Sequence, residues 1–379
     1  MRLGALFLLA ALIVGALGCR PSQPVTPPKI VPPPIVASSQ RQQMATLAFL
    51  SYLGGDLKGS DDEVEKVLVP CMQTALADNG LVNDWSLVWG PAVYKFSIAE
   101  LDDNMMYVVR DSANPAHLAI VVRGTNPKAL DDWLAEDFDV DVQVAWEYGT
   151  PPSGAKISKG TSEGLLHLQT MTPAGGPGQG QTLGAFLTAQ SKAYPSLQLD
   201  VTGHSLGGAL APTLALWLAD TQADWGSGSV QIQVYPLAGP TAGNLDFATY
   251  YDSRLGPRTD RLHNPYDIVP LAWNVETLGT MADLYEPVAH ADDILRGLID
   301  HLRDLVKDKG YSQIKPDAPP LPGAVNPADT DFFEQAEWQH HCGYQCPLGI
   351  DVAVSPDCKN PPSTLCDQCP QPTAPAPSR

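Results

Sequence analysis

The stretch "LQLDVTGHSLGGALAPTLALWLAD", residues 197–220, constrains the fold more than any other part of the sequence. Its first seven residues alternate apolar and polar side chains, as in a strand, and from residue 207 the apolar residues follow helical spacing. Between the two patterns stands Ser205, with Gly203 and Gly207 two positions away on either side. A serine in so sharp a turn adopts strained backbone angles, and side chains at the two glycine positions would collide. The stretch therefore predicts a tight strand–turn–helix unit that exposes the serine hydroxyl.

Strand and helix patterns alternate in the rest of the chain. The apolar, β-branched runs 105–111 and 117–125 are separated by "SANPA" and predict a hairpin. Two further strands are expected at 197–203 and 230–239, each after a helix-like segment. This alternation predicts an α/β fold, with a mostly parallel central sheet and helices on both faces.

The segment 291–310 predicts a long amphipathic helix that covers the core. It ends at Gly310, a residue typical of helix termini. Its apolar residues recur at helical spacing, at Ile294, Leu295, Leu298, Ile299, Leu302, Leu305 and Val306.

The N-terminal residues are typical of an exported bacterial protein. Residues 1–18 have the early cation and apolar run of a signal peptide. The following "GALGC" resembles a lipobox, in which Cys19 becomes the lipidated first residue; the alternative is an ordinary signal peptide with an incidental cysteine. A proline-rich tether over 19–38 would then lead to a folded domain over 39–350. We expect a cell-envelope lipoprotein, anchored to a membrane by its N-terminal lipid, at the outer membrane or cell surface.

The net charge and the cysteine content indicate which ligands and cross-links to expect. The net charge of −19 disfavours nucleic-acid binding and electrostatic adhesion to anionic lipid. In an exported chain, the six cysteines beyond residue 19 favour up to three disulfides, and five of them predict a stapled C-terminal tail over 351–379. A zinc site is the weaker alternative, because "CDQC" has no second pair with histidines at suitable spacing. The cysteines are Cys71, Cys342, Cys346, Cys358, Cys366 and Cys369.

Ser205 is a candidate nucleophile. A serine hydroxyl needs a base to take its proton, and the reaction needs donors for the oxyanion that develops. The start of the following helix supplies one donor, the backbone N–H of Leu206. The alternative is a glycine-rich turn whose serine has no chemical role.

Three motifs in consistent order resemble the class 3 (fungal-type) lipases, a branch of the α/β-hydrolases. They are "VVRGT…DDWLAEDF", "VTGHSLGGALA" and "NPYDIVP", and the resemblance spans roughly residues 85–350. It implies an α/β-hydrolase fold and a serine ester hydrolase that cleaves lipid esters through an acyl-enzyme, without metal or organic cofactor. Triacylglycerol lipase is the leading activity, with carboxylesterase and phospholipase as alternatives. A non-catalytic surface-binding lipoprotein and a peptidase or amidase are the other hypotheses.

The resemblance also implies the rest of a catalytic triad. The acid would be Asp267 of "NPYDIVP", whereas Asp252 and Asp260 fall in a polar stretch that suggests exposure to solvent. The base would lie in "EQAEWQHHCGYQCPLGI", where His340 and His341 each match a spacing found in the family. The choice between them stays open, and a disulfide between the neighbouring Cys342 and Cys346 could hold this loop.

Three other expectations come from the resemblance. Thr125 of "VVRGT" would supply the second oxyanion donor. Residues 126–140 have one apolar face and would form a lid over the serine, or else a static amphipathic helix. His204 would be a packing position, because a histidine base follows the acid in this fold.

Overall fold

The computed structural model describes residues 39–55, 57–94, 104–124, 139–227, 229–350 and 352. The chain divides into two compact units, Met1–Pro34 and Ile35–Arg379, and every described residue belongs to the second. The expected signal peptide, Cys19, most of the tether and nearly all of the tail lie outside the described residues. Within them, no helix is both long and apolar enough to cross a bilayer.

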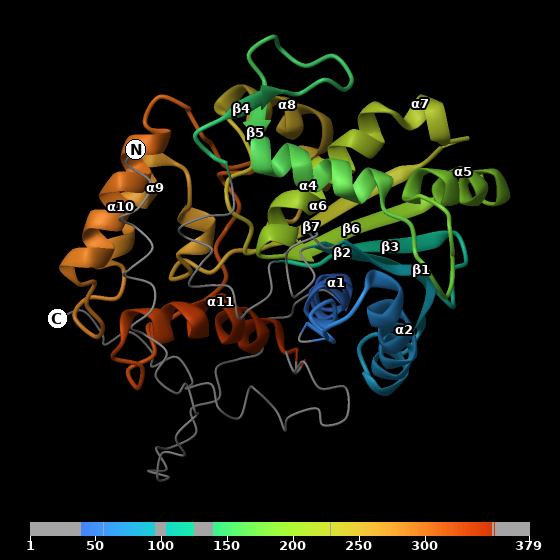
Figure 1. The fold of residues 1–379 in the computed structure, drawn as a ribbon, viewed down its shortest axis with the longest axis horizontal. Coiled ribbons are helices and arrows are strands. Elements are labelled where there is room, and N and C mark those ends of the chain that lie inside the picture. The colour runs from blue at the N-terminus through green and yellow to red at the C-terminus, as the bar shows by residue number, and fades with distance from the viewer. Residues whose placement is uncertain are drawn as a thin grey trace. The chain divides into compact units, whose positions relative to one another are not determined.

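A five-stranded sheet forms the centre of the second unit (Figure 1). Its spatial order is β1 (Trp85–Tyr94), β2 (Asn104–Asp111), β3 (His117–Val122), β6 (Gln198–His204) and β7 (Gln231–Leu237). The predicted hairpin is confirmed, because β2 and β3 pair antiparallel. A short second sheet pairs β4 (Gln143–Ala145) with β5 (Lys156–Ser158).

The sheet is mixed, so the expectation of a mostly parallel sheet is wrong. Strands β1, β2 and β3 pair antiparallel in succession, whereas β3, β6 and β7 pair parallel. The physical reason lies in the connections. Parallel neighbours need a crossover, which helices provide between β3 and β6 and between β6 and β7. Among the described residues, no helix lies between β1 and β3.

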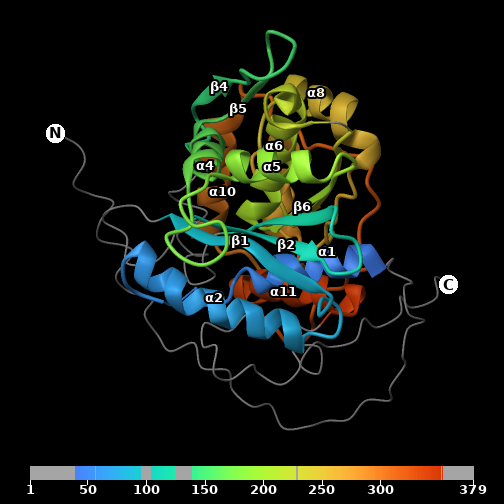
Figure 2. The ribbon, with the colours of Figure 1, turned by 90° about the vertical axis from the view of Figure 1, so that its right-hand side faces the viewer.

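Helices cover both faces of the sheet, as predicted (Figure 2). Helices α1, α2 and α11 pack on one face, and α4, α5, α6 and α8 on the other. The helices are α1 (Ser39–Leu50), α2 (Asp61–Asp78), α4 (Lys159–Thr170), α5 (Leu183–Ala193), α6 (Leu206–Asp220), α7 (Gln222–Trp225), α8 (Leu245–Leu255), α9 (Val275–Leu278), α10 (Asp293–Val306) and α11 (Phe332–Leu348).

The strand side chains divide between two cores. In β3, Leu118, Ile120 and Val122 belong to the core under α6. Ala119 and Val121 belong to the core under α1 and α2. Successive strand residues point to opposite faces, so a strand buried on both faces is apolar throughout, as the sequence of β3 is.

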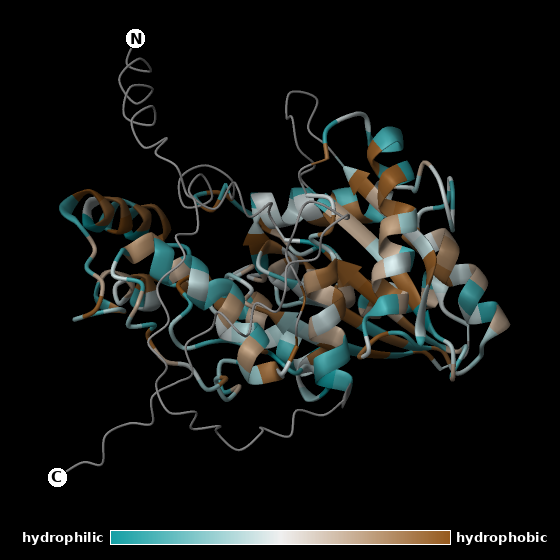
Figure 3. Cartoon of the chain, turned by 90° about the horizontal axis from the view of Figure 1, so that it is seen from below, coloured by the Kyte–Doolittle hydropathy of each residue, from teal (hydrophilic) through white to brown (hydrophobic). Residues whose placement is uncertain are grey.

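The predicted amphipathic helix is confirmed as α10. Asp292 caps its start by accepting the backbone N–H of Leu295, and Gly310 adopts a left-handed φ of 63° four residues beyond its end. The inner side chains of α10 contribute to a third apolar cluster, together with Ile268 and Phe332. Figure 3 shows brown and teal alternating around the outer helices, as in amphipathic helices.

Candidate active site

Ser205 occupies the predicted turn between β6 and α6. Its φ of 62° and ψ of −127° are strained for a residue with a side chain. A Cβ on Gly203 would lie 2.6 Å from the Val122 carbonyl oxygen, and a Cβ on Gly207 would overlap the same oxygen. Both positions therefore exclude any side chain, which explains the G-x-S-x-G spacing.

Helix α6 starts directly after the serine. A Cβ on Gly208 would overlap the Leu237 carbonyl oxygen, so the small residue lets α6 approach β7 closely. Leu206 is the first residue of α6, and its backbone N–H has no acceptor within the helix. This N–H is placed as the predicted oxyanion donor would be.

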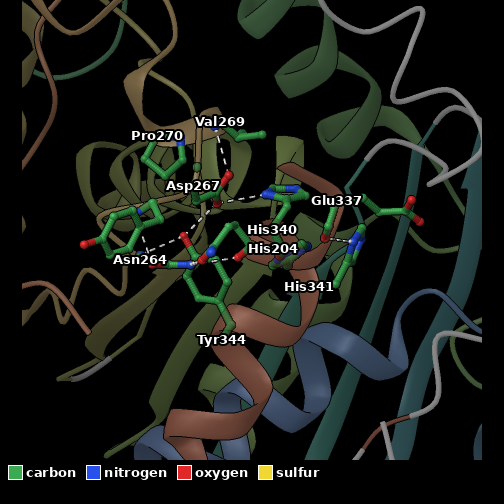
Figure 4. A network of polar contacts seen from close by, with 12 residues as sticks. His204, Asn264, Asp267, Val269, Pro270, Glu337, His340, His341 and Tyr344 are labelled. Atoms are coloured by element: carbon green, nitrogen blue, oxygen red, sulfur yellow. Dashed lines mark hydrogen bonds and ion pairs between the residues drawn. The ribbon is translucent and has the colours of Figure 1, made fainter. Parts of the chain in front are cut away.

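Asp267 and His340 form a buried pair beside this turn (Figure 4). His340 Nδ1 lies 2.9 Å from Oδ2 of Asp267, and both side chains are at most 1% exposed. The Asp267 carboxylate also accepts the Tyr344 hydroxyl at 2.8 Å and the backbone N–H of Val269 at 3.0 Å. Because the carboxylate is the acceptor, the imidazole carries its proton on Nδ1 and presents a bare Nε2.

The Nε2 atom of His340 is buried and has no hydrogen-bond partner among the residues that the structure describes. The His340 ring lies 4.5 Å, between centroids, from the ring of His204, the residue that precedes Ser205. The unpaired nitrogen is therefore held close to the turn that carries the serine, as a general base requires.

The two adjacent histidines have different surroundings because they lie on a helix. The expected loop is α11, and consecutive side chains on a helix point about 100° apart. His341 turns away from Asp267, is only partly buried, and places Nδ1 3.1 Å from the Glu337 carbonyl oxygen. Burial, and then the charge of His340, lower the pKa of His341 to about 3.

Comparisons with known proteins relate the chain to lipases. The family model described as "Lipase (class 3)" matches residues 119–276. A solved structure described as M37 lipase is 38% identical, with a TM-score of 0.77, over 82% of this chain and 92% of that one. The chain belongs to the class 3 lipase family. A lipase from Rhizomucor miehei is 32% identical over 182 residues, which are 48% of this chain and only 42% of the Rhizomucor protein.

The class 3 lipase match contains Ser205 and Asp267 but ends before α10 and α11. His340 therefore lies outside the matched segment. In this class 3 lipase, Asn264 connects the loop that carries Asp267 to Gln339, the residue before His340. Its Nδ2 donates to the backbone carbonyl oxygen of Gln339 at 2.9 Å and to the side-chain oxygen of Gln339 at 2.7 Å. Asn264 is the first residue of the "NPYDIVP" motif, so this contact explains the asparagine there.

Sequence reasoning missed Tyr52, which follows α1. Its hydroxyl contacts the side chain of Ser205 and the backbone of Gly124. It also lies 2.8 Å from Nδ1 of His204. Burial raises the pKa of Tyr52, so its hydroxyl stays protonated. No local pattern marks this residue, because Tyr52 and His204 are 152 positions apart in the sequence and only the fold brings them together.

The expected disulfide between Cys342 and Cys346 is wrong, because neither cysteine is disulfide-bonded. Side chains four residues apart on a helix have Cβ atoms about 5–6 Å apart, whereas a disulfide needs about 3.5–4.5 Å. The helix itself holds His340 in place. Cys71 is disulfide-bonded, and Cys358, Cys366 and Cys369 lie outside the described residues.

The predicted second oxyanion donor, Thr125, and nearly all of the predicted lid, residues 126–138, lie outside the described residues. Gly124 is described, and a Cβ there would lie 2.8 Å from Cβ of Ser205, so the end of the β3 segment runs beside the serine. The competing acids have partners elsewhere: Asp252 accepts the backbone N–H of Lys315, and Asp260 pairs with Arg41.

Proposed function

We propose that the chain is a serine hydrolase of lipid esters, with triacylglycerol-like esters as the leading substrates. The observation that carries the proposal is the buried Asp267–His340 pair beside the strained Ser205 turn in a class 3 lipase. Ser205 is the nucleophile, His340 the general base, and Asp267 orients the imidazole. Carboxylesterase and phospholipase activity are the alternatives within the same chemistry.

The reaction follows from these positions. The Ser205 oxygen attacks the ester carbonyl while Nε2 of His340 takes the hydroxyl proton. The backbone N–H groups of Leu206 and Thr125 bind the oxyanion of the tetrahedral intermediate. The imidazolium then protonates the leaving alcohol, which gives an acyl-enzyme, and water activated by the same imidazole releases the acid and restores the serine.

The proposal includes the cellular location of the protein. Cys19 would carry the lipid that anchors the chain in the cell envelope, and the tail cysteines would form disulfides there. Replacement of Cys19 by serine should move the protein from the membrane fraction to the soluble fraction. An unchanged distribution would reject the lipid anchor while leaving the enzymatic proposal intact.

The test of substrate class is hydrolysis of p-nitrophenyl esters of graded chain length, below and above their solubility limits, with Ser205→Ala as the control. A lipase prefers long chains and gains activity on the dispersed substrate. A preference for short, dissolved esters would assign a carboxylesterase instead. No turnover of any ester by the wild type would reject the proposed function.

A further inference from the structure

His204 makes more contacts than a packing residue needs. It is fully buried at the end of β6, one residue before Ser205. Its Nδ1 lies 2.8 Å from the Tyr52 hydroxyl, and its Nε2 lies 2.8 Å from the backbone carbonyl oxygen of His340. One imidazole thus joins the segment after α1, the turn at Ser205 and the helix that carries His340.

The hydrogen-bond partners of His204 determine its tautomer. A carbonyl oxygen only accepts, so the Nε2 atom of His204 must carry the proton. Nδ1 is then an acceptor, and the Tyr52 hydroxyl must donate to it. Burial is the main cause that holds the pKa of His204 well below its usual value, so the ring stays neutral.

This tautomer also orients the contact with the nucleophile. The single hydroxyl proton of Tyr52 is directed to His204, so Tyr52 can only accept in its contact with Ser205. The resting serine hydroxyl therefore donates to Tyr52. This agrees with the unpaired Nε2 of His340.

We propose that His204 is a positioning residue: its Nε2–H holds the backbone of His340, and its Nδ1 orients the hydroxyl of Tyr52, so that base and nucleophile keep a fixed separation. This inference rests on the proposed hydrolase function. Neighbouring aromatic rings restrict rotation of the imidazole, since the centroids of Phe49 and His340 lie 4.6 Å and 4.5 Å from that of His204. A displacement of about 1 Å in such a site can cost about 10²-fold in rate.

Two substitutions separate hydrogen bonding from packing. His204→Phe keeps a ring among its aromatic neighbours and removes both hydrogen bonds. His204→Gln replaces the ring by an amide that can donate to the carbonyl and accept from the hydroxyl. His341→Gln is the matched control, because His341 belongs to the same cluster of rings but its hydrogen bond is to Glu337 on its own helix.

The experiment measures kcat and KM across pH on a soluble p-nitrophenyl ester, with thermal unfolding as the test of fold. We expect His204→Phe to lower kcat about 10²-fold, with little change in KM and a shifted pH profile. His204→Gln should recover most of kcat, and His341→Gln should retain it. A folded His204→Phe with wild-type kcat and pH profile, or a Gln variant no better than Phe, would overturn the inference.

Two further outcomes are informative. Should His204→Phe fail to fold, the Gln variant decides: near wild-type kcat supports the inference, and a loss as large as that of His340→Ala contradicts it. Failure of the proposed function is distinguishable, because the wild type and the His341 control would then hydrolyse no ester.

Discussion

The Nδ1 atom of His340 lies 2.9 Å from Oδ2 of Asp267, although 73 residues separate the two in the chain. The contact joins helix α11 to the loop between α8 and α9, and it is fully enclosed. An imidazole bonded in this way through Nδ1 presents Nε2 to a reacting proton, which supports His340 as the proposed base. His341, its neighbour in sequence, makes no such contact.

The two histidines should therefore differ sharply when replaced. His340→Ala removes the imidazole bonded to Asp267, and we expect kcat to fall by roughly 10⁴-fold or more. His341→Ala should stay within about tenfold of the wild type, because a contact near the site but outside the reaction has a small effect. Steady-state hydrolysis of one soluble ester by both variants provides the test. Equal losses, or a larger loss from His341, would reject the assignment.

Tyr344 should contribute to catalysis through Asp267. Tyr344→Phe removes one of the three hydrogen bonds to the carboxylate and the acceptor for the Asn264 N–H at 3.0 Å. We expect kcat to fall about tenfold or more and the free energy of unfolding by about 1–3 kcal/mol. Tyr251→Phe is the control, since it loses the hydrogen bond between the hydroxyl of the buried Tyr251 and that of Thr259, away from the site. It should lose stability and keep kcat; a similar kcat for both variants would contradict the role of Tyr344.

The turn at Ser205 should not accommodate even a methyl group at position 207. Gly207→Ala would place Cβ against the Val122 carbonyl oxygen, a rigid backbone atom. We expect a loss of about 3 kcal/mol or more in the free energy of unfolding, or no soluble protein. Gly297→Ala in α10 has nothing within 4 Å of the new carbon, and should stabilise by about 0.5–1 kcal/mol. Denaturant unfolding of both variants compares them directly, and a tolerated Gly207→Ala would refute the steric account of the motif.

Glu65 should make stability depend on pH. Its side chain is 1% exposed and accepts backbone N–H groups of Val93 and Ala174. Burial outweighs these bonds and raises the pKa of Glu65 to about 6 from 4.5. The folded state then binds more protons than the unfolded state between these values, so stability is present below pH 4.5 and falls as pH rises towards 6.

A shift of this size corresponds to about 2 kcal/mol. Glu65→Gln removes the titration, so the difference in unfolding free energy between wild type and variant should change by about this amount from pH 4.5 to 6.5. Denaturant unfolding at each pH measures the difference. A difference that does not vary with pH would show that Glu65 does not titrate in this range.

Local patterns predicted the parts of the fold that depend on neighbours in sequence. The strand–turn–helix unit at Ser205, the hairpin of β2 and β3, and the helix α10 each follow from residues within about twenty positions. The mixed sheet was missed because strand direction depends on how distant strands pair. The sequence interpretation treated the residues around His340 as a loop, whereas they form α11, whose buried residues pack against the rest of the protein.

The candidate site was likewise predictable where it depends on short sequence motifs. Ser205 and Asp267 each stand in a short motif, but the choice between His340 and His341 needed the helical geometry of α11. Tyr52 and the hydrogen bonds of His204 have no sequence signal at all. They arise because α1, β6 and α11 converge, and contacts between such distant segments are decided by the whole core.

The account depends most directly on Ser205 as the nucleophile. The most direct test of this role is labelling of the wild type and of Ser205→Ala with an organophosphonate ester, followed by mass spectrometry. Unfolding measurements check that the variant is folded. We predict one adduct per wild-type chain, on Ser205, with loss of ester hydrolysis, and neither adduct nor hydrolysis in a folded Ser205→Ala variant. Hydrolysis that survives in Ser205→Ala, or an adduct at another residue that accompanies the loss of activity, would contradict the account.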